Sequence, residues 1–173
     1  ALYEGVLHKK VKGEFFLKLC IKHLPQEKNN LVVNRTLSFL RIIYSTYLDE
    51  GSRQLIQDDL ERFCINMVNN KAEGKNKKSY FNTLLSICSS PKSCSYLSSV
   101  LKGEQDLPED VTINEQDKIS IAFNLVLRDT SVYEDTKAYI MRTVKNKDLL
   151  DRFEYVYPSL SGDKQVRDSV FNA

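Results

Sequence analysis

Apolar residues return along almost the whole chain at intervals of three or four residues, and no segment alternates convincingly between apolar and polar residues. Such intervals keep side chains on one face of an α-helix, whereas strict alternation is typical of a half-buried strand. The longest stripe runs through Val33, Leu37, Leu40, Tyr44 and Tyr47. The sequence therefore predicts an all-α fold.

Proline, glycine and serine residues mark where the predicted helices begin and end. Pro25 is expected to end a first helix over residues 13–24, because it forces the residue before it out of the helical region. Gly51 is expected to break the chain after the long stripe. Ser90 as N-cap and Pro91 as the first helical residue predict a new helix at that point, and Gly103 is expected to end it.

Two further helix starts match the capping box, in which a serine or threonine is followed three residues later by a glutamate. They are Thr112 with Glu115, and Ser131 with Glu134. About nine or ten helices joined by short loops predict an irregular α-solenoid of stacked antiparallel helical hairpins, similar to HEAT or armadillo arrays. The length of 173 residues fits one domain over residues 1–173.

Large apolar side chains within the predicted stripes are expected to anchor the core. They are Phe15, Leu40, Phe63, Phe81, Phe123 and Phe153. Truncating such a buried side chain to alanine typically costs about 3–5 kcal/mol.

The balance of charge and hydrophobicity excludes several classes of partner. Lys and Arg number 25 and Asp and Glu 23, so the net charge is +2, whereas a dedicated nucleic-acid binder normally has a marked basic excess. No apolar run approaches the roughly 18–20 residues that span a bilayer. We therefore expect a soluble segment that binds no nucleic acid and spans no membrane, and the sequence leaves its compartment open.

No residue pattern predicts a metal site or a nucleophile within the chain. The two histidines, His8 and His23, are far apart and no HExxH motif joins them, so zinc binding by this segment is not expected. His23 is interpreted as an imidazole at a helix end. The four cysteines are expected to be buried thiols, although Cys88 and Cys94 straddle a turn and the sequence leaves a disulfide between them open.

Three clusters of charged or polar residues are interpreted as solvent-facing structure. Lys71, Lys75, Lys77 and Lys78 could form a phosphate-binding loop, but a solvated loop is favoured. Asp58, Asp59 and Glu61 could contain an acid–base pair, but an exposed helix face is favoured. The sequon at Asn34 falls inside a predicted helix and is interpreted as accidental.

Three arginines, Arg128, Arg152 and Arg167, could steer a peptide carboxylate, but pairing within the structure is favoured. We therefore predict no catalytic, cofactor-binding or metal-binding residue in the chain.

Four blocks of the sequence resemble, in order, a C-terminal segment of zinc aminopeptidases of the aminopeptidase N family. A "Leu-Pro-x-Glu…Asn" turn and a long helix match residues 24–48, and paired helices around a Ser-Pro turn match residues 77–104. A helix with a similar Asp, Ala, Leu and Arg pattern matches residues 113–129. The last block, YPSLSGDKQVRDSVFNA, is similar to a helical hairpin of bacterial members.

The resemblance implies that the chain is the non-catalytic C-terminal helical domain of a metallopeptidase. In such enzymes a separate catalytic domain binds zinc, and the helical domain covers its cleft and restricts access to peptides with a free N-terminus. None of the family's zinc ligands or catalytic residues matches a position here. The missing initiator Met and a last helix that runs to Ala173 also lead us to expect a segment of a longer chain. The alternative is a free-standing helical scaffold that binds a protein or peptide partner.

Overall fold

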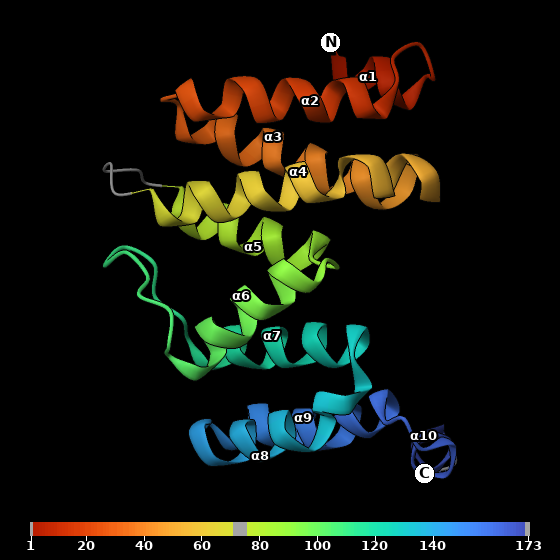
Figure 1. Cartoon of the computed structure of the whole chain (residues 1–173), viewed down its shortest axis with the longest axis vertical. Coiled ribbons are helices and arrows are strands. Elements are labelled where there is room, and N and C mark those ends of the chain that lie inside the picture. Colours follow the sequence, from red (N-terminus) through yellow and green to blue (C-terminus); the bar gives the residue numbers. More distant parts are fainter. Residues whose placement is uncertain (1, 71–75, 172–173) are drawn as a thin grey trace. The chain divides into compact units, whose positions relative to one another are not determined.

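The computed structural model describes residues 2–70 and 76–171 (Figure 1). Within these residues there are ten α-helices and no β-strand, which confirms the all-α prediction. The helices are α1 Leu2–Leu7, α2 Gly13–His23, α3 Asn30–Ile42, α4 Glu50–Asn69, α5 Lys77–Ile87, α6 Pro91–Lys102, α7 Glu115–Arg128, α8 Tyr133–Thr143, α9 Lys147–Val156 and α10 Lys164–Phe171. Four shorter turns extend them, which are the 3₁₀ turns Leu24–Gln26, Thr130–Val132 and Tyr157–Leu160 and the π-helical turn Ile43–Tyr47.

The helices belong to two compact units. The N-terminal unit contains the residues up to Ser93 together with Leu107–Thr112, and the C-terminal unit contains Cys94–Asp106 and the residues from Ile113 onward. The chain first passes from one unit to the other within α6, and Leu107–Thr112 returns to the N-terminal unit.

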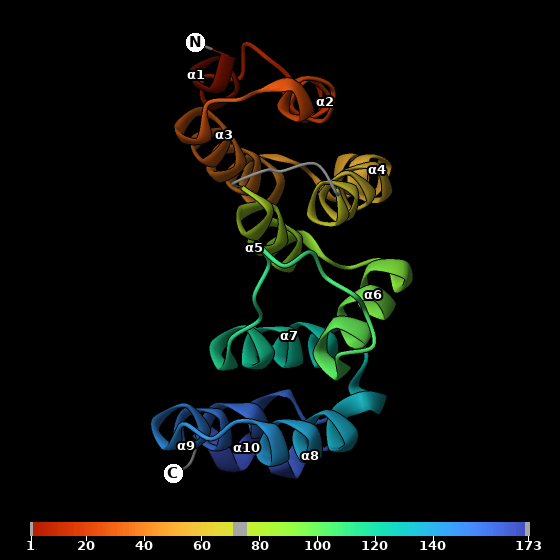
Figure 2. The ribbon, with the colours of Figure 1, turned by 90° about the vertical axis from the view of Figure 1, so that its left-hand side faces the viewer.

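Helices of the N-terminal unit form two layers. Helix α2 packs against α4, α3 packs against α5, and α4 and α5 contact each other extensively. In Figure 2, α2 and α4 lie on one side of this unit and α3 and α5 on the other. Stacking of successive helix pairs in this way is the arrangement expected of helical hairpins.

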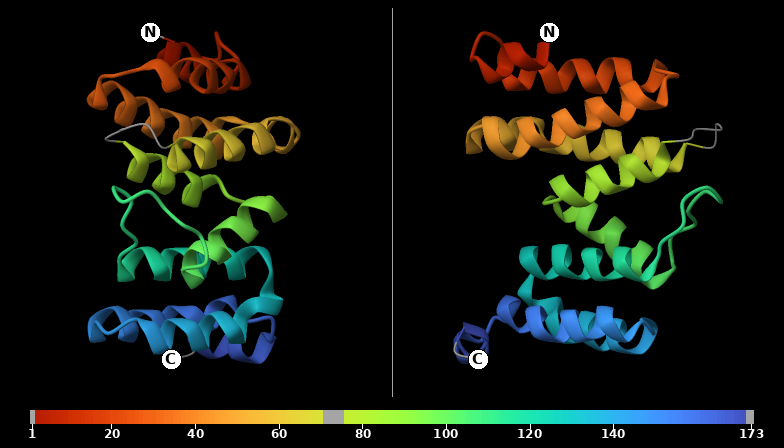
Figure 3. Two further views of the ribbon diagram at one scale, coloured as in Figure 1. Left: turned by 60° about the vertical axis from the view of Figure 1, so that its left-hand side comes forward. Right: turned by 180° about the vertical axis from the view of Figure 1, so that it is seen from behind.

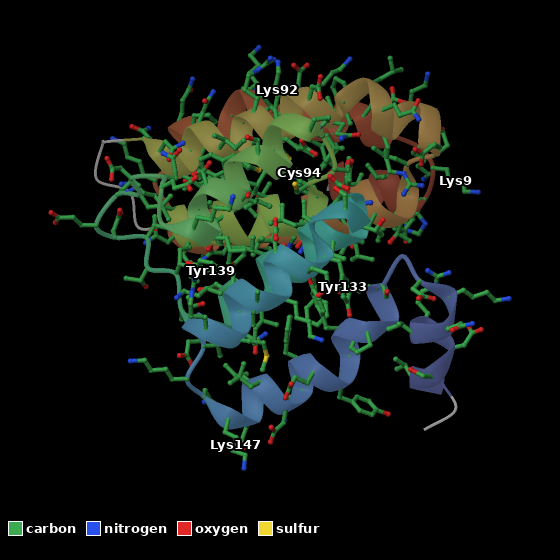
Figure 4. The ribbon with its side chains drawn as sticks, turned by 60° about the horizontal axis from the view of Figure 1, so that its bottom comes forward. Lys9, Lys92, Cys94, Tyr133, Tyr139 and Lys147 are labelled. Carbon is green, nitrogen blue, oxygen red and sulfur yellow. The ribbon has the colours of Figure 1, made fainter. Side chains whose placement is uncertain are left out.

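The C-terminal unit is built around α7, which packs against α8 and α9 (Figure 3). Its core holds an aromatic cluster in which Tyr157 is fully buried. The Tyr157 hydroxyl donates a hydrogen bond of 3.0 Å to the carbonyl oxygen of Tyr133, which is labelled in Figure 4. The ring centroids of Tyr157 and Phe153 are 4.3 Å apart. A buried hydroxyl needs such a partner, so this bond fixes the start of α8.

Four of the six expected core anchors are buried, namely Leu40, Phe63, Phe81 and Phe153. Phe123 is half-buried and contacts the aromatic cluster. The prediction for Phe15 is wrong, because its side chain is 53% exposed. Successive residues of an α-helix point about 100° apart, and α2 turns Phe16 and Leu17 toward the core instead.

The predicted long stripe is interrupted after Tyr44. Tyr44 is buried as expected, but Tyr47 is 43% exposed and Leu48 is buried in its place. The cause is the π-helical turn Ile43–Tyr47, in which each turn holds more residues than in an α-helix. The residue three positions after Tyr44 therefore no longer lies on the buried face of the helix.

Several predicted helix ends are confirmed. Helix α2 ends at His23 and Pro25 lies in the 3₁₀ turn that follows. Pro91 begins α6, and the hydroxyl of Ser90 accepts a hydrogen bond of 3.2 Å from the amide of Ser93. The chain leaves α6 at Gly103, whose φ of +74° favours glycine.

The break predicted at Gly51 is displaced, because Gly51 lies in the first turn of α4. The carboxylate of Asp49 accepts a hydrogen bond of 2.8 Å from the amide of Ser52 and caps the helix. An aspartate cap outweighs the poor helix propensity of a glycine in the first turn.

The capping box predicted at Thr112 and Glu115 is wrong by two residues. Asn114 and Asp117 form it instead, with reciprocal hydrogen bonds of 2.8 and 2.9 Å between side chain and backbone. An asparagine–aspartate pair satisfies the same backbone amides as the expected threonine–glutamate pair.

The capping box predicted at Ser131 and Glu134 is absent from the start of α8, where no side chain caps the helix. Asp129 accepts a hydrogen bond of 2.9 Å from the amide of Ser131, which folds the preceding residues into a 3₁₀ turn. This local bond competes with the capping box and moves the start of α8 to Tyr133.

Candidate functional sites

Both histidines are exposed. His8 is exposed in the turn after α1, and His23 is exposed as the last residue of α2, as its interpretation as a helix-end imidazole requires. Among residues 2–70 and 76–171, no group of three or more His, Cys, Asp or Glu side chains could hold a metal ion.

All four cysteines are thiols, and three of them are buried as predicted. Cys20, Cys64 and Cys88 are buried, whereas Cys94 is half-buried. Burial raises the pKa of the Cys20 thiol to about 12. Burial, with a smaller contribution from the charge of Glu61, raises the pKa of the Cys64 thiol well above its usual range. Both thiols stay protonated at neutral pH and are poor nucleophiles.

Glu61 is buried, so the prediction of a solvent-facing carboxylate is wrong for this residue, although Asp58 and Asp59 are exposed as expected. Its Oε1 atom accepts hydrogen bonds of 2.7 Å from the Ser89 amide and 3.2 Å from the Ser90 amide. Its Oε2 atom accepts from the Ser90 hydroxyl. A buried carboxylate is tolerated when several donors satisfy it in this way.

This contact fastens α4 to the turn between α5 and α6. The two amides that Glu61 accepts from precede the first turn of α6, where negative charge is favourable. The sequence does contain a signal for the burial, because Glu61 lies at helical spacing from the buried Cys64 and Val68. Glu61 thus joins α4 to the turn between α5 and α6.

Glu115 makes a similar contact in the C-terminal unit. Its carboxylate oxygens accept hydrogen bonds of 2.8 Å from the Lys145 amide and 3.1 Å from the Asn146 amide. The side chain of Asn146 also caps α9 by accepting from the Leu149 amide. A glutamate at the start of α7 therefore fixes the turn between α8 and α9.

The interpretation of the lysine cluster as a solvated loop is wrong for Lys77 and Lys78. Lys77 is buried, and its Nζ atom lies 2.9 Å from a carboxylate oxygen of Asp110. Lys78 is half-buried and donates a hydrogen bond of 3.0 Å to the carbonyl oxygen of Thr112. Lys71 and Lys75 lie outside the described residues.

The contacts of Arg167 support structural pairing. Its guanidinium donates hydrogen bonds of 2.6 Å to the carbonyl oxygen of Ser161 and 2.9 Å to that of Gly162. Arg128 and Arg152 are exposed on α7 and α9. Asn34 is exposed on α3, so its sequon lies inside a helix as predicted.

No helix in the described part of the chain is long and apolar enough to cross a membrane. Comparison of the chain with models of protein families, with curated proteins and with solved structures finds no match.

Proposed function

We propose that the chain is a non-catalytic helical domain of a zinc aminopeptidase of the aminopeptidase N family. In this proposal it covers the catalytic cleft of the same protein and restricts which peptides enter. Zinc belongs to the catalytic domain, and peptides with a free N-terminus are the substrates.

The observation that supports the proposal is the order of four sequence blocks along the chain, which resembles the order of the family's motifs. Two of these blocks hold their proline in a helix-end position, with Pro25 in the 3₁₀ turn after α2 and Pro91 at the start of α6. In the last block, Arg167 holds the carbonyl groups of the turn before α10. Pro25, Pro91 and Arg167 thus have structural roles in this chain, as we expect of motif residues in a non-catalytic domain.

The catalytic half of the proposal is tested by zinc content and by hydrolysis of a chromogenic aminoacyl substrate. Both are measured on the 173-residue chain and on the full-length product of its gene. We expect an inert, zinc-free domain beside an active, zinc-loaded full-length protein. A full-length protein that is also inert and free of zinc would refute the proposal.

The cleft-covering half is tested by adding the separate domain to a version of the full-length protein that lacks it. We expect the shortened protein to accept longer peptides, and the added domain to restore the preference for short ones. An unchanged preference in the shortened protein would exclude a role in access.

A free-standing helical scaffold is the second candidate, and exposed apolar side chains on several helices favour it. Leu31 is 79% exposed, Leu55 is 83% exposed and Tyr155 is 68% exposed. These side chains are the positions at which an apolar surface of such a partner would bind. A partner that binds the isolated domain, and whose binding Leu55→Asp abolishes, would favour the scaffold if the full-length protein has no peptidase activity.

A further inference from the structure

The segment Leu107–Thr112 belongs to the N-terminal unit, although the residues on both sides of it belong to the C-terminal unit. We call this segment the strap. It contributes one buried side chain, that of Val111, and the Val111 amide donates a hydrogen bond of 2.8 Å to the carbonyl oxygen of Pro108 within the strap. Leu107 and Pro108 are only half-buried, so Val111 is the one fully covered apolar side chain of the strap.

Two adjacent lysines in the first turn of α5 hold the strap. The Lys77 ammonium group pairs with Asp110 at 2.9 Å, and the Lys78 ammonium group donates to the carbonyl oxygen of Thr112 at 3.0 Å. The Lys77 side chain is 7% exposed, whereas the Asp110 side chain is 45% exposed. The buried partner of the pair thus belongs to the helix and the solvated partner to the strap.

Helix α5 has an unusual first turn that explains why the strap binds there. It begins with two lysines and has no acidic residue in its first turn, although the positive end of a helix favours negative charge. The side chain of Asn76 caps no amide of α5 and donates instead to Asn30. Asp110 supplies the negative charge that the helix itself does not provide.

We propose that the strap detaches from the N-terminal unit while the helices of that unit stay folded. Segments with few buried apolar contacts open locally at a smaller free-energy cost than the core. An ion pair with a solvated partner is weakened by salt, so ionic strength shifts the strap toward its open state. Opening leaves Lys77 without its carboxylate, and an anion that competes with Asp110 for Lys77 favours the open state.

Hydrogen exchange followed by mass spectrometry on the full chain tests the strap. The variants are Lys77→Met, which removes the buried charge, and Asp110→Asn, which removes the solvated one without altering the core. The matched control is Lys92→Met, since Lys92 is exposed in the first turn of α6 (Figure 4). Peptides covering the strap are compared with peptides from α3 to α5.

We expect the Val111 amide, whose hydrogen bond lies within the strap, to exchange about fivefold faster or more in both variants, because detachment removes the contacts that hold this turn in place. Exchange in α3, α4 and α5 and in the control should match the unaltered chain. Added sodium chloride should accelerate strap exchange in the unaltered chain more than in Asp110→Asn. Unchanged strap exchange in both variants would overturn the proposal, and so would an equal loss of protection across α3 to α5, because the strap would then be inseparable from the unit.

Discussion

Replacing Glu61 with alanine should be among the most destabilising single changes outside the apolar core. The substitution removes the acceptor of two backbone amides, those of Ser89 and Ser90, and of the Ser90 hydroxyl. A hydroxyl can turn to another acceptor, but a backbone amide cannot. A buried donor left without a partner costs about 1–3 kcal/mol, so the two amides together imply a loss of about 2–6 kcal/mol.

The isosteric change Glu61→Gln separates the acceptor from the charge. A glutamine can keep its carbonyl oxygen on the Oε1 side, where the amides of Ser89 and Ser90 both donate. The Ser90 hydroxyl can then accept from the new amide group. The loss is therefore the difference between charged and neutral hydrogen bonds, about 1–2 kcal/mol.

Urea unfolding followed by helical circular dichroism measures the free energy of unfolding of each variant. Asp58→Ala is the matched control, because Asp58 is an exposed carboxylate on the same helix, and its effect should stay within about 0.5 kcal/mol. If Glu61→Ala fell within that same margin, the reasoning about the turn would be wrong. If glutamine cost as much as alanine, the charge rather than the acceptor geometry would hold the turn.

Three further predictions follow from particular contacts. Gly13→Ala should destabilise the chain by about 1–3 kcal/mol in thermal unfolding, because its Cβ would lie 2.8 Å from the Leu48 side chain, although alanine is the better helix former. Tyr157→Phe should cost about 1 kcal/mol in urea unfolding, the value of a buried hydrogen bond such as that to Tyr133. The pKa of Cys20 is about 12 in the folded chain against an ordinary value of 9.0, so the unfolded chain loses this proton first as the pH rises. Stability should therefore be full below pH 9 and fall by about 1.4 kcal/mol at pH 10 through this thiol, and Cys20→Ala should show a shallower decline; an identical decline would contradict the assignment.

The fold class could be predicted from the sequence because the residues on the buried face of a helix are apolar and recur every three or four positions. The stripe of α5, for example, is buried at Phe81, Leu84 and Leu85. Helix ends were accessible where a residue acts on its own backbone, as Pro91 and Gly103 do. Such signals are local, so one sequence is enough to read them.

The predictions that are wrong share a different cause. In each, the position of the side chain depends on a distant residue or on a change in backbone geometry. Tyr47 is exposed because a π-helical turn holds more residues than an α-helical turn. No residue in the sequence signals that a π-helical turn forms here. Lys77 is buried because Asp110 neutralises it from a position 33 residues away. A charge whose partner is distant looks like a solvated charge in the sequence.

The difference between local and distant contacts also explains why the sequence shows no internal repeat, although one kind of hydrogen-bonded contact occurs in both units. In each unit a glutamate accepts from two consecutive backbone amides in the turn before a later helix, over 28 and 29 residues for Glu61 and over 30 and 31 residues for Glu115. The donors are backbone groups, which nearly every residue type provides. Each occurrence therefore constrains one residue, the glutamate, and leaves the receiving turn free to differ. A repeat held together in this way can keep its packing while its sequence period disappears, as in irregular helical-hairpin arrays.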